Sequence, residues 1–239
     1  MAVLGVKKMI SKYNHDKMTN REIKWLVIHW VGDESTAVNN GTYFQGGDRG
    51  ASAHYFVDDK NIVQSVLEKN AAWAVGSRGL LDQGSPYAKY GGKYFGKCTN
   101  ANSLSIEMCC KKDSKDNLYI TKATLERTAQ LVQAIQKRLG IDNAHVIRHF
   151  DVNGKLCPLP YVQDSKWDDV HALLTGQKFK VRAKGNLIVR KTSSLLSKNL
   201  KTLKKGSTYN IVRVSSNGKR GKLSTGGWIT ITNKYVERI

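Results

Sequence analysis

The order of hydrophobic and polar residues predicts several buried β-strands in the first part of the chain. Runs of β-branched, aromatic and other apolar side chains are separated by polar or glycine-containing segments, as is typical of strands inside a sheet. The predicted strands comprise residues 24–30, 53–57, 62–66, 103–109 and 144–149. We expect Gly32 to end the first strand and residues 58–61 to form a hairpin turn.

The same pattern predicts helices between these strands. Apolar residues recur at intervals of three and four over residues 121–139, and Gly140 follows, which indicates an amphipathic helix with a glycine C-cap. Shorter helices are expected over residues 36–46, with Ser35 as the N-cap, and over residues 167–174. Residues 76–99 lack periodicity, and we predict a long surface loop there. Strands alternating with helices favour an α/β fold.

The pattern changes after Gly176. Short strand-like runs follow, among them residues 187–190, 207–214 and 227–230, with a turn expected at residues 216–219. Such runs predict a small all-β barrel. We therefore expect two domains, at residues 1–175 and 178–239, which a chain of 239 residues accommodates.

Charge is distributed unevenly between these two parts. The formal net charge is +20, and residues 177–239 hold 16 Lys/Arg and a single acid, hence +15. This excess predicts attraction to a polyanion, and nucleic acid, anionic lipid and the teichoic acids of a bacterial wall all fit. A nucleic-acid binder of this kind predicts aromatic residues interleaved with basic ones on one surface. Few aromatic residues are available here beyond Tyr209, Trp228 and Tyr235, so we predict no nucleic-acid partner.

Targeting signals and disulfides are not expected. No apolar run approaches the roughly 20 residues that span a bilayer, so no membrane partner is predicted. Residues 1–14 carry a short apolar stretch ahead of their lysines, the reverse of a secretory signal peptide, and we expect synthesis in the cytoplasm. The four cysteines are irregularly spaced, which does not favour a disulfide framework.

Three residues indicate a metal site with an open coordination position. His29 and His149 end predicted strands, and Cys157 follows His149 after a turn at Gly154. A His-His-Cys set suits Zn²⁺ and leaves one position for water, whose pKa zinc lowers to about 7. The alternatives are structural histidines and a small buried thiol.

Residues 1–175 resemble the type 2 N-acetylmuramoyl-L-alanine amidases, which share a fold with the peptidoglycan recognition proteins. The similar segments are residues 27–29, 52–58, 74–77 and 102–107, and residues 148–149 together with 155–158. The resemblance implies a central mixed β-sheet flanked by helices, with His29, His149 and Cys157 as zinc ligands. It also implies hydrolysis of the amide bond between N-acetylmuramic acid and L-alanine in peptidoglycan.

Further site residues follow from this resemblance. Glu107 would act as general base, and Lys155 would donate to the oxyanion, although a surface lysine is the alternative. His54 and Trp73 would contact substrate, the alternatives being a hydrogen-bonded structural histidine and a packed tryptophan. Ala53 stands where some members carry a hydroxyl residue, so we assign no catalytic role to Tyr55.

The last part of the chain resembles bacterial SH3-like domains. The similar segments are residues 186–190, 203–207, 227–229 and 233–236. This resemblance implies a module that binds the cell wall, including its anionic polymers. An amidase joined to such a module has the organisation of a phage endolysin, a monomer made in the host cytoplasm and released to lyse a Gram-positive wall. A non-catalytic peptidoglycan-binding protein and a bacterial autolysin are the alternatives.

Overall fold

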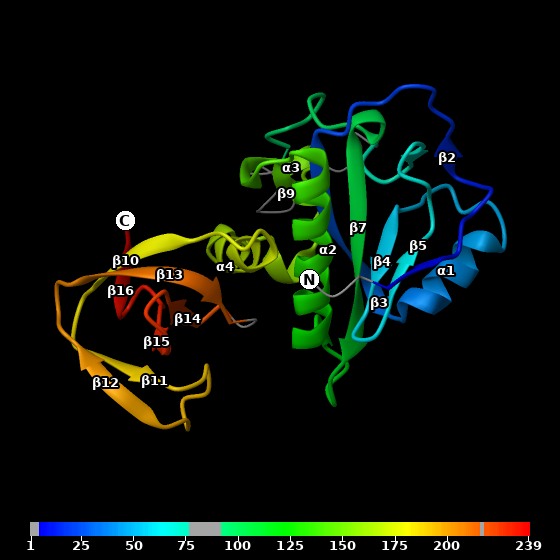
Figure 1. Ribbon diagram of the computed structural model, residues 1–239. Helices are drawn as coiled ribbons and strands as arrows, with labels where there is room; N and C mark the ends of the chain where they lie inside the picture. Colours follow the sequence, from blue (N-terminus) through cyan, green and yellow to red (C-terminus); the bar gives the residue numbers. More distant parts are fainter. Residues whose placement is uncertain (1–4, 77–91, 216–217) are drawn as a thin grey trace. The chain divides into compact units, whose positions relative to one another are not determined.

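The chain forms two compact units, described by a computed structural model over residues 5–76, 92–215 and 218–239. The N-terminal unit is Met1–Gln163 and the C-terminal unit is Asp164–Ile239 (Figure 1). The domain limits expected at residues 175 and 178 stay a prediction. Most of the predicted loop at 76–99 and half of the turn at 216–219 lie outside the described residues.

A mixed β-sheet forms the centre of the N-terminal unit. Its strands run in the order β1-β5-β4-β7-β3-β9, and β8 also pairs with β7. The strands are β1 (Val6–Lys8), β3 (Trp25–Glu34), β4 (Tyr55–Val57), β5 (Ile62–Gln64), β7 (Ser103–Lys112), β8 (Leu118–Tyr119) and β9 (Val146–Arg148). The pairs β4–β5 and β7–β8 are antiparallel and the others are parallel. A separate pair joins β2 (His15–Asp16) and β6 (Ala71–Ala72).

Helices cover both faces of this sheet, which confirms the predicted α/β fold. They are α1 (Ala37–Gln45), α2 (Lys122–Leu139) and α3 (His149–Asn153), with 3-10 turns at Asn100–Asn102, Asn143–His145 and Leu159–Tyr161. Figure 1 shows α1 and α2 on opposite sides of the central strands. Gly140 caps α2 in the left-handed conformation as predicted. The N-cap of α1 is Thr36 rather than Ser35, because the Thr36 side chain accepts from the Asn39 amide.

The first strand does not end at Gly32, contrary to the prediction. Instead β3 continues to Glu34, and its register with β7 shifts between Trp30 and Glu34. Gly32 has a φ of +78°, a conformation that glycine adopts without steric cost. The glycine therefore permits an irregularity within the strand rather than terminating it.

The carboxylate of Asp59 joins the turn between β4 and β5 to the start of α2. Thr121 and Thr124 donate to Asp59 Oδ1, and Lys111 Nζ lies 2.5 Å from Oδ2. Burial alone would raise the pKa of Asp59, but these three partners lower it to about 2.

We expect Asp59→Asn to lower the free energy of unfolding by about 1–2 kcal/mol at pH 7, because it weakens the bonds to α2. The native pKa lies below the unfolded value of about 3.9, so the contribution is present above that pH and is lost as the pH falls towards 2. Urea unfolding at pH 7 and pH 2.5 measures both effects. Asp33→Asn, at an exposed carboxylate, is the control, and equal losses in the two variants would contradict the prediction.

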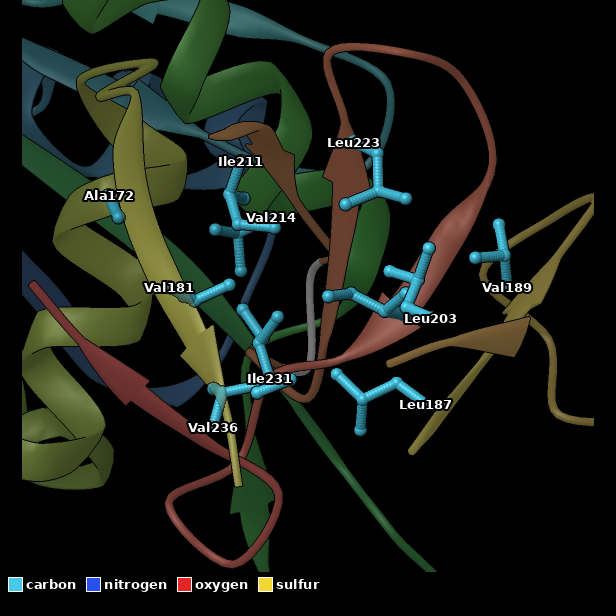
Figure 2. Packing of buried hydrophobic residues seen from close by; sticks show 12 residues of the cluster. Ala172, Val181, Leu187, Val189, Leu203, Ile211, Val214, Leu223, Ile231 and Val236 are labelled. Carbon is cyan, nitrogen blue, oxygen red and sulfur yellow. The ribbon is translucent and has the colours of Figure 1, made fainter. Parts of the chain in front are cut away.

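The C-terminal unit is an antiparallel sheet with one helix, α4 (Asp164–Leu174). Its strand order is β12-β11-β15-β14-β13-β10-β16. The strands are β10 (Phe179–Ala183), β11 (Leu187–Arg190), β12 (Asn199–Leu203), β13 (Thr208–Val214), β14 (Arg220–Leu223), β15 (Trp228–Thr230) and β16 (Val236–Arg238). Buried aliphatic residues from these strands, such as Val181, Ile211 and Leu223, pack together with Ala172 of α4 (Figure 2). The β-strands predicted for residues 178–239 are confirmed as an antiparallel sheet.

None of the helices within the described ranges has the length and apolar character to cross a membrane.

Candidate metal centre

Three neighbouring parallel strands bring the central residues of the site to one level. His29 on β3 is the register partner of Glu107 on β7. On the other side of β3, Ile28 pairs with Arg148 on β9. The next residue of each segment, His29 and His149, therefore lies at about the same height in the sheet. Residues at matched positions of paired strands point to the same face of a sheet. The sheet thus places two imidazoles and a carboxylate side by side.

The segment after β9 brings Cys157 back to the two histidines. His149 is the first residue of α3 rather than the last residue of a strand as predicted. Gly154 ends this helix with a φ of +78° and reverses the chain. The Phe150 amide then donates to the Cys157 carbonyl over 2.8 Å. This turn holds Cys157 beside His149.

The three predicted metal ligands form one buried cluster. The possible ligand atoms of His29, His149 and Cys157 lie within 4.8 Å of one another. Cys157 Sγ is 3.8 Å from His29 Nδ1, and the two imidazole rings have centroids 4.5 Å apart. The three residues are 2%, 4% and 3% exposed. The group could therefore hold a metal ion such as zinc.

Within the residues that the structure describes, three ring nitrogens of this cluster lack the partners that a fully hydrogen-bonded structural group would have. Among the described residues, His29 Nε2 and both ring nitrogens of His149 are buried without a hydrogen-bond partner. Buried polar atoms without a partner cost free energy. A metal ion accepts one lone pair from each neutral imidazole, so it would satisfy one of the two His149 nitrogens, and the donor set fits the ion implied by the sequence.

The protonation states also suit a metal. Burial lowers the pKa of His29 well below its usual value, and His149 and Lys155 lower it further. Burial, with the charge of Lys155, lowers the pKa of His149 to about 3. Both imidazoles are therefore neutral at pH 7, the form that ligates metals. Burial raises the pKa of the Cys157 thiol, and Glu107 raises it further, so metal binding would displace the thiol proton.

Glu107 lies against this cluster. Its Oε1 is 3.8 Å from His29 Nδ1, and its side chain is 20% exposed. Its Oε2 is buried without a hydrogen-bond partner in the described part of the chain. Burial raises the pKa of Glu107 to about 7, although the charge of Lys155 lowers it in part. A carboxylate with this proton affinity can both accept and return a proton near neutral pH.

The other predicted site residues differ in their surroundings. Lys155 is exposed, between the turn at Gly154 and Cys157, and its charge acts on His29, His149 and Glu107. The side chain of Trp73 is 37% exposed. These positions are compatible with substrate contact, which stays a prediction for both residues.

His54 has the surroundings of a structural residue. Its ring is fully buried, Nδ1 accepts from the Ser105 amide over 3.1 Å, and Nε2 lies 3.0 Å from the Asn70 carbonyl. Burial lowers the pKa of His54 to about 3. Both nitrogens are used within the fold, which favours the structural alternative over substrate contact.

A buried ion pair that the sequence reasoning missed supports two of the ligands. Arg148 precedes His149, and its guanidinium donates to both oxygens of Asp151 at 2.6–3.2 Å. The same guanidinium donates to the carbonyls of Tyr161 and Val162. It thereby joins α3 to the segment that follows Cys157. In the sequence, this ion pair was indicated only by an arginine and an aspartate placed three residues apart.

We expect Arg148→Lys to weaken zinc binding about 10–100-fold, because outer-shell contacts orient metal ligands and lysine cannot reproduce the bidentate pair. Competition with a chromophoric chelator measures the affinity, and circular dichroism checks the fold. Arg138→Lys, in an exposed pair with Glu68, is the matched control. Unchanged zinc affinity in a folded Arg148→Lys protein would contradict the expectation.

Comparisons with known proteins agree with this geometry. The family model described as N-acetylmuramoyl-L-alanine amidase matches residues 19–160. N-acetylmuramoyl-L-alanine amidase CwlL of Bacillus licheniformis is 30% identical over 214 residues, which are 85% of this chain and 54% of CwlL. N-acetylmuramoyl-L-alanine amidase CwlA of Bacillus subtilis strain 168 is 26% identical over 232 residues, covering 94% of this chain and 77% of CwlA. The chain thus spans about half the length of CwlL.

A solved structure agrees with the fold. The structure of PlyL superposes with a TM-score of 0.55 at 20% identity, over 72% of this chain and 97% of PlyL. At that identity the likeness shows the fold alone. The family match covers His29, Glu107, His149, Lys155 and Cys157.

Proposed function

Because the chain belongs to the N-acetylmuramoyl-L-alanine amidase family, we propose that it hydrolyses the amide bond between N-acetylmuramic acid and L-alanine in bacterial peptidoglycan. The observation that carries this proposal is the buried His-His-Cys cluster with unsatisfied imidazole nitrogens, directly beside Glu107. A peptidoglycan-binding protein without catalytic activity would have no need for an ionisable carboxylate next to a set of metal ligands.

The proposed metal is zinc, held by His29, His149 and Cys157. Bound zinc would supply Lewis acidity, which polarises the amide carbonyl and activates a water molecule at neutral pH. The mixed nitrogen and sulfur donors support zinc over magnesium or calcium, which prefer oxygen ligands.

Glu107 is the proposed general base. Its Oε2 has no partner among the described residues and is available to accept a proton from the attacking water. The same carboxyl group would then return this proton to the leaving amine of L-alanine, which cannot depart as an anion. The register partnership with His29 supports this role, because it keeps the carboxylate beside the ligands.

Lys155 is the proposed stabiliser of the oxyanion that develops when water attacks the carbonyl. The residue is exposed, so its ammonium group can turn towards a bound substrate. Its positive charge already acts on the ligands and on Glu107. A cation placed where negative charge develops lowers the barrier to acyl transfer.

The C-terminal unit is proposed to be an SH3-like module that keeps the enzyme on the wall. Its antiparallel sheet and the charge of +15 over residues 177–239 support attraction to anionic wall polymers. We further propose that the protein serves as a phage endolysin, made in the host cytoplasm and acting on a Gram-positive wall after its release.

Digestion of purified Gram-positive peptidoglycan tests the proposed reaction. Mass analysis of the soluble products should reveal new free amino termini on L-alanine. Their formation should stop when the metal is removed by a chelator and resume when zinc is added back. New reducing sugar ends, or amino termini within the stem peptide, would indicate that a different bond is cut. Wall binding without any new ends would favour a recognition protein.

A further inference from the structure

The hairpin between β11 and β12 (Figure 1) carries two exposed leucines in its connecting turn. We call residues 191–198 the leucine tip. Within it, the side chains of Leu195 and Leu196 are 62% and 97% exposed. Adjacent apolar side chains that face water at the end of a hairpin contribute nothing to the core of the unit. Contiguous exposed apolar surface marks interaction sites.

The leucine tip is an ordered turn. Across its base, the Lys191 amide donates to the Lys198 carbonyl over 2.9 Å, and the Thr192 amide donates to Ser197 Oγ over 2.9 Å. The Arg190 guanidinium donates to the Ser197 carbonyl over 3.0 Å. These bonds hold the turn in one conformation. The backbone that carries the leucines is therefore tied at both ends of the turn.

The hairpin that carries the leucines is positively charged. From Leu187 to Leu203 the hairpin contains Arg190, Lys191, Lys198 and Lys201 and no acidic residue. All three lysines are exposed. In the ranges that the structure describes, none of the three has a carboxylate within ion-pair distance. The hairpin thus combines two exposed leucines with exposed lysines that have no carboxylate partner among the described residues.

We propose that the leucine tip docks on an anionic lipid bilayer, with Leu195 and Leu196 in the interface and Lys191, Lys198 and Lys201 against the headgroups. Peripheral membrane binding is stable when an apolar anchor and a basic patch act together, and this hairpin has both. A hydrated anionic polymer would attract the lysines but would leave the leucines in water. The exposed leucines therefore favour lipid over wall polymer as the partner of this tip.

This inference goes beyond the proposed amidase reaction and does not depend on it. The sequence predicted no membrane partner because it contains no apolar run long enough to span a bilayer. Docking of a hairpin tip requires no such run, since only two side chains enter the interface. The sequence around Leu195 and Leu196 does not predict their exposure either, because a pair of leucines in a strand-rich segment is equally compatible with burial.

Co-sedimentation of the full chain with vesicles tests the proposal. We expect binding to vesicles of phosphatidylglycerol with phosphatidylcholine, and little binding to phosphatidylcholine alone. The double variant L195S/L196S should lower the partition coefficient about tenfold or more, because it removes the apolar anchor. The matched control is I239S, which alters another exposed apolar residue of the same unit and should bind like wild type. K191Q/K198Q should also weaken binding, relative to the exposed pair K178Q/K222Q.

Three outcomes would overturn the proposal. Wild type could fail to bind anionic vesicles. L195S/L196S could bind them as well as wild type does, which would leave only attraction between charges. Sedimentation velocity without lipid could detect a wild-type dimer that L195S/L196S abolishes, and the leucines would then form an interface between copies of the chain. Circular dichroism of each variant verifies that the fold is retained.

Discussion

Cys157→Ala is expected to eliminate zinc binding and to lower the rate of L-alanine amino-terminus release at least about a thousandfold. The variant removes the only anionic ligand of the proposed set and leaves two neutral imidazoles, one from a distant strand. Metal ions supply several kcal/mol of transition-state stabilisation in acyl transfer, and each 1.36 kcal/mol corresponds to about a tenfold change in rate. Elemental analysis of the purified protein and mass analysis of wall digests measure the two effects.

Cys98→Ala is the matched control for this prediction. Cys98 is also a buried free thiol, but it packs against Trp25, Val75 and Val152 in a separate apolar cluster. We expect this control to retain zinc and activity, with a modest loss of stability. A Cys157→Ala protein that keeps both zinc and activity would show that the thiol is a buried hydrophobe and that the metal site has been assigned incorrectly.

Glu107→Gln is expected to separate proton transfer from metal binding. The amide is isosteric with the carboxylate but cannot accept a proton from water, so the turnover number should fall by about 10²–10⁴-fold. Zinc content should remain that of wild type, because Glu107 contacts His29 without belonging to the His-His-Cys set. Steady-state release of new ends, together with elemental analysis, tests both expectations.

Glu34→Gln is the control for the carboxylate. Glu34 ends β3, is exposed and accepts from the Lys112 amide, so its removal should leave the turnover number close to that of wild type. Loss of zinc from Glu107→Gln would indicate that Glu107 acts as a ligand. Full activity in that variant would contradict its role as general base.

The two histidines of the metal cluster were accessible from the sequence because each comes directly after a run of apolar strand residues. The runs before His29 and His149 predict β3 and β9, and parallel strands end at a common edge. The neighbouring position of Glu107 follows from the pairing of β7 with β3. The order of the strands in the sheet cannot be deduced from any one strand, so this neighbour required the family resemblance.

The features that the sequence did not predict have a different physical origin. The strand β1 was not predicted because Val6–Lys8 carries two exposed lysines and no alternating pattern, and it exists only through its pairing with β5. Strand formation at a sheet edge depends on such tertiary context. The surroundings of His54 could not be predicted either, because they involve Arg21, which is 33 residues away in the sequence. The Arg21 guanidinium lies beside His54 and donates to the Asn70 and Ser103 carbonyls.

The short turn between His149 and Cys157 has a consequence for folding. These two ligands come together through the local reversal at Gly154, which costs little chain entropy because the loop is small. His29 comes from a strand 120 residues earlier in the sequence. A metal complex of all three would therefore act like a cross-link that closes a long loop, and loss of the ion would raise the conformational entropy of the unfolded chain relative to the folded unit.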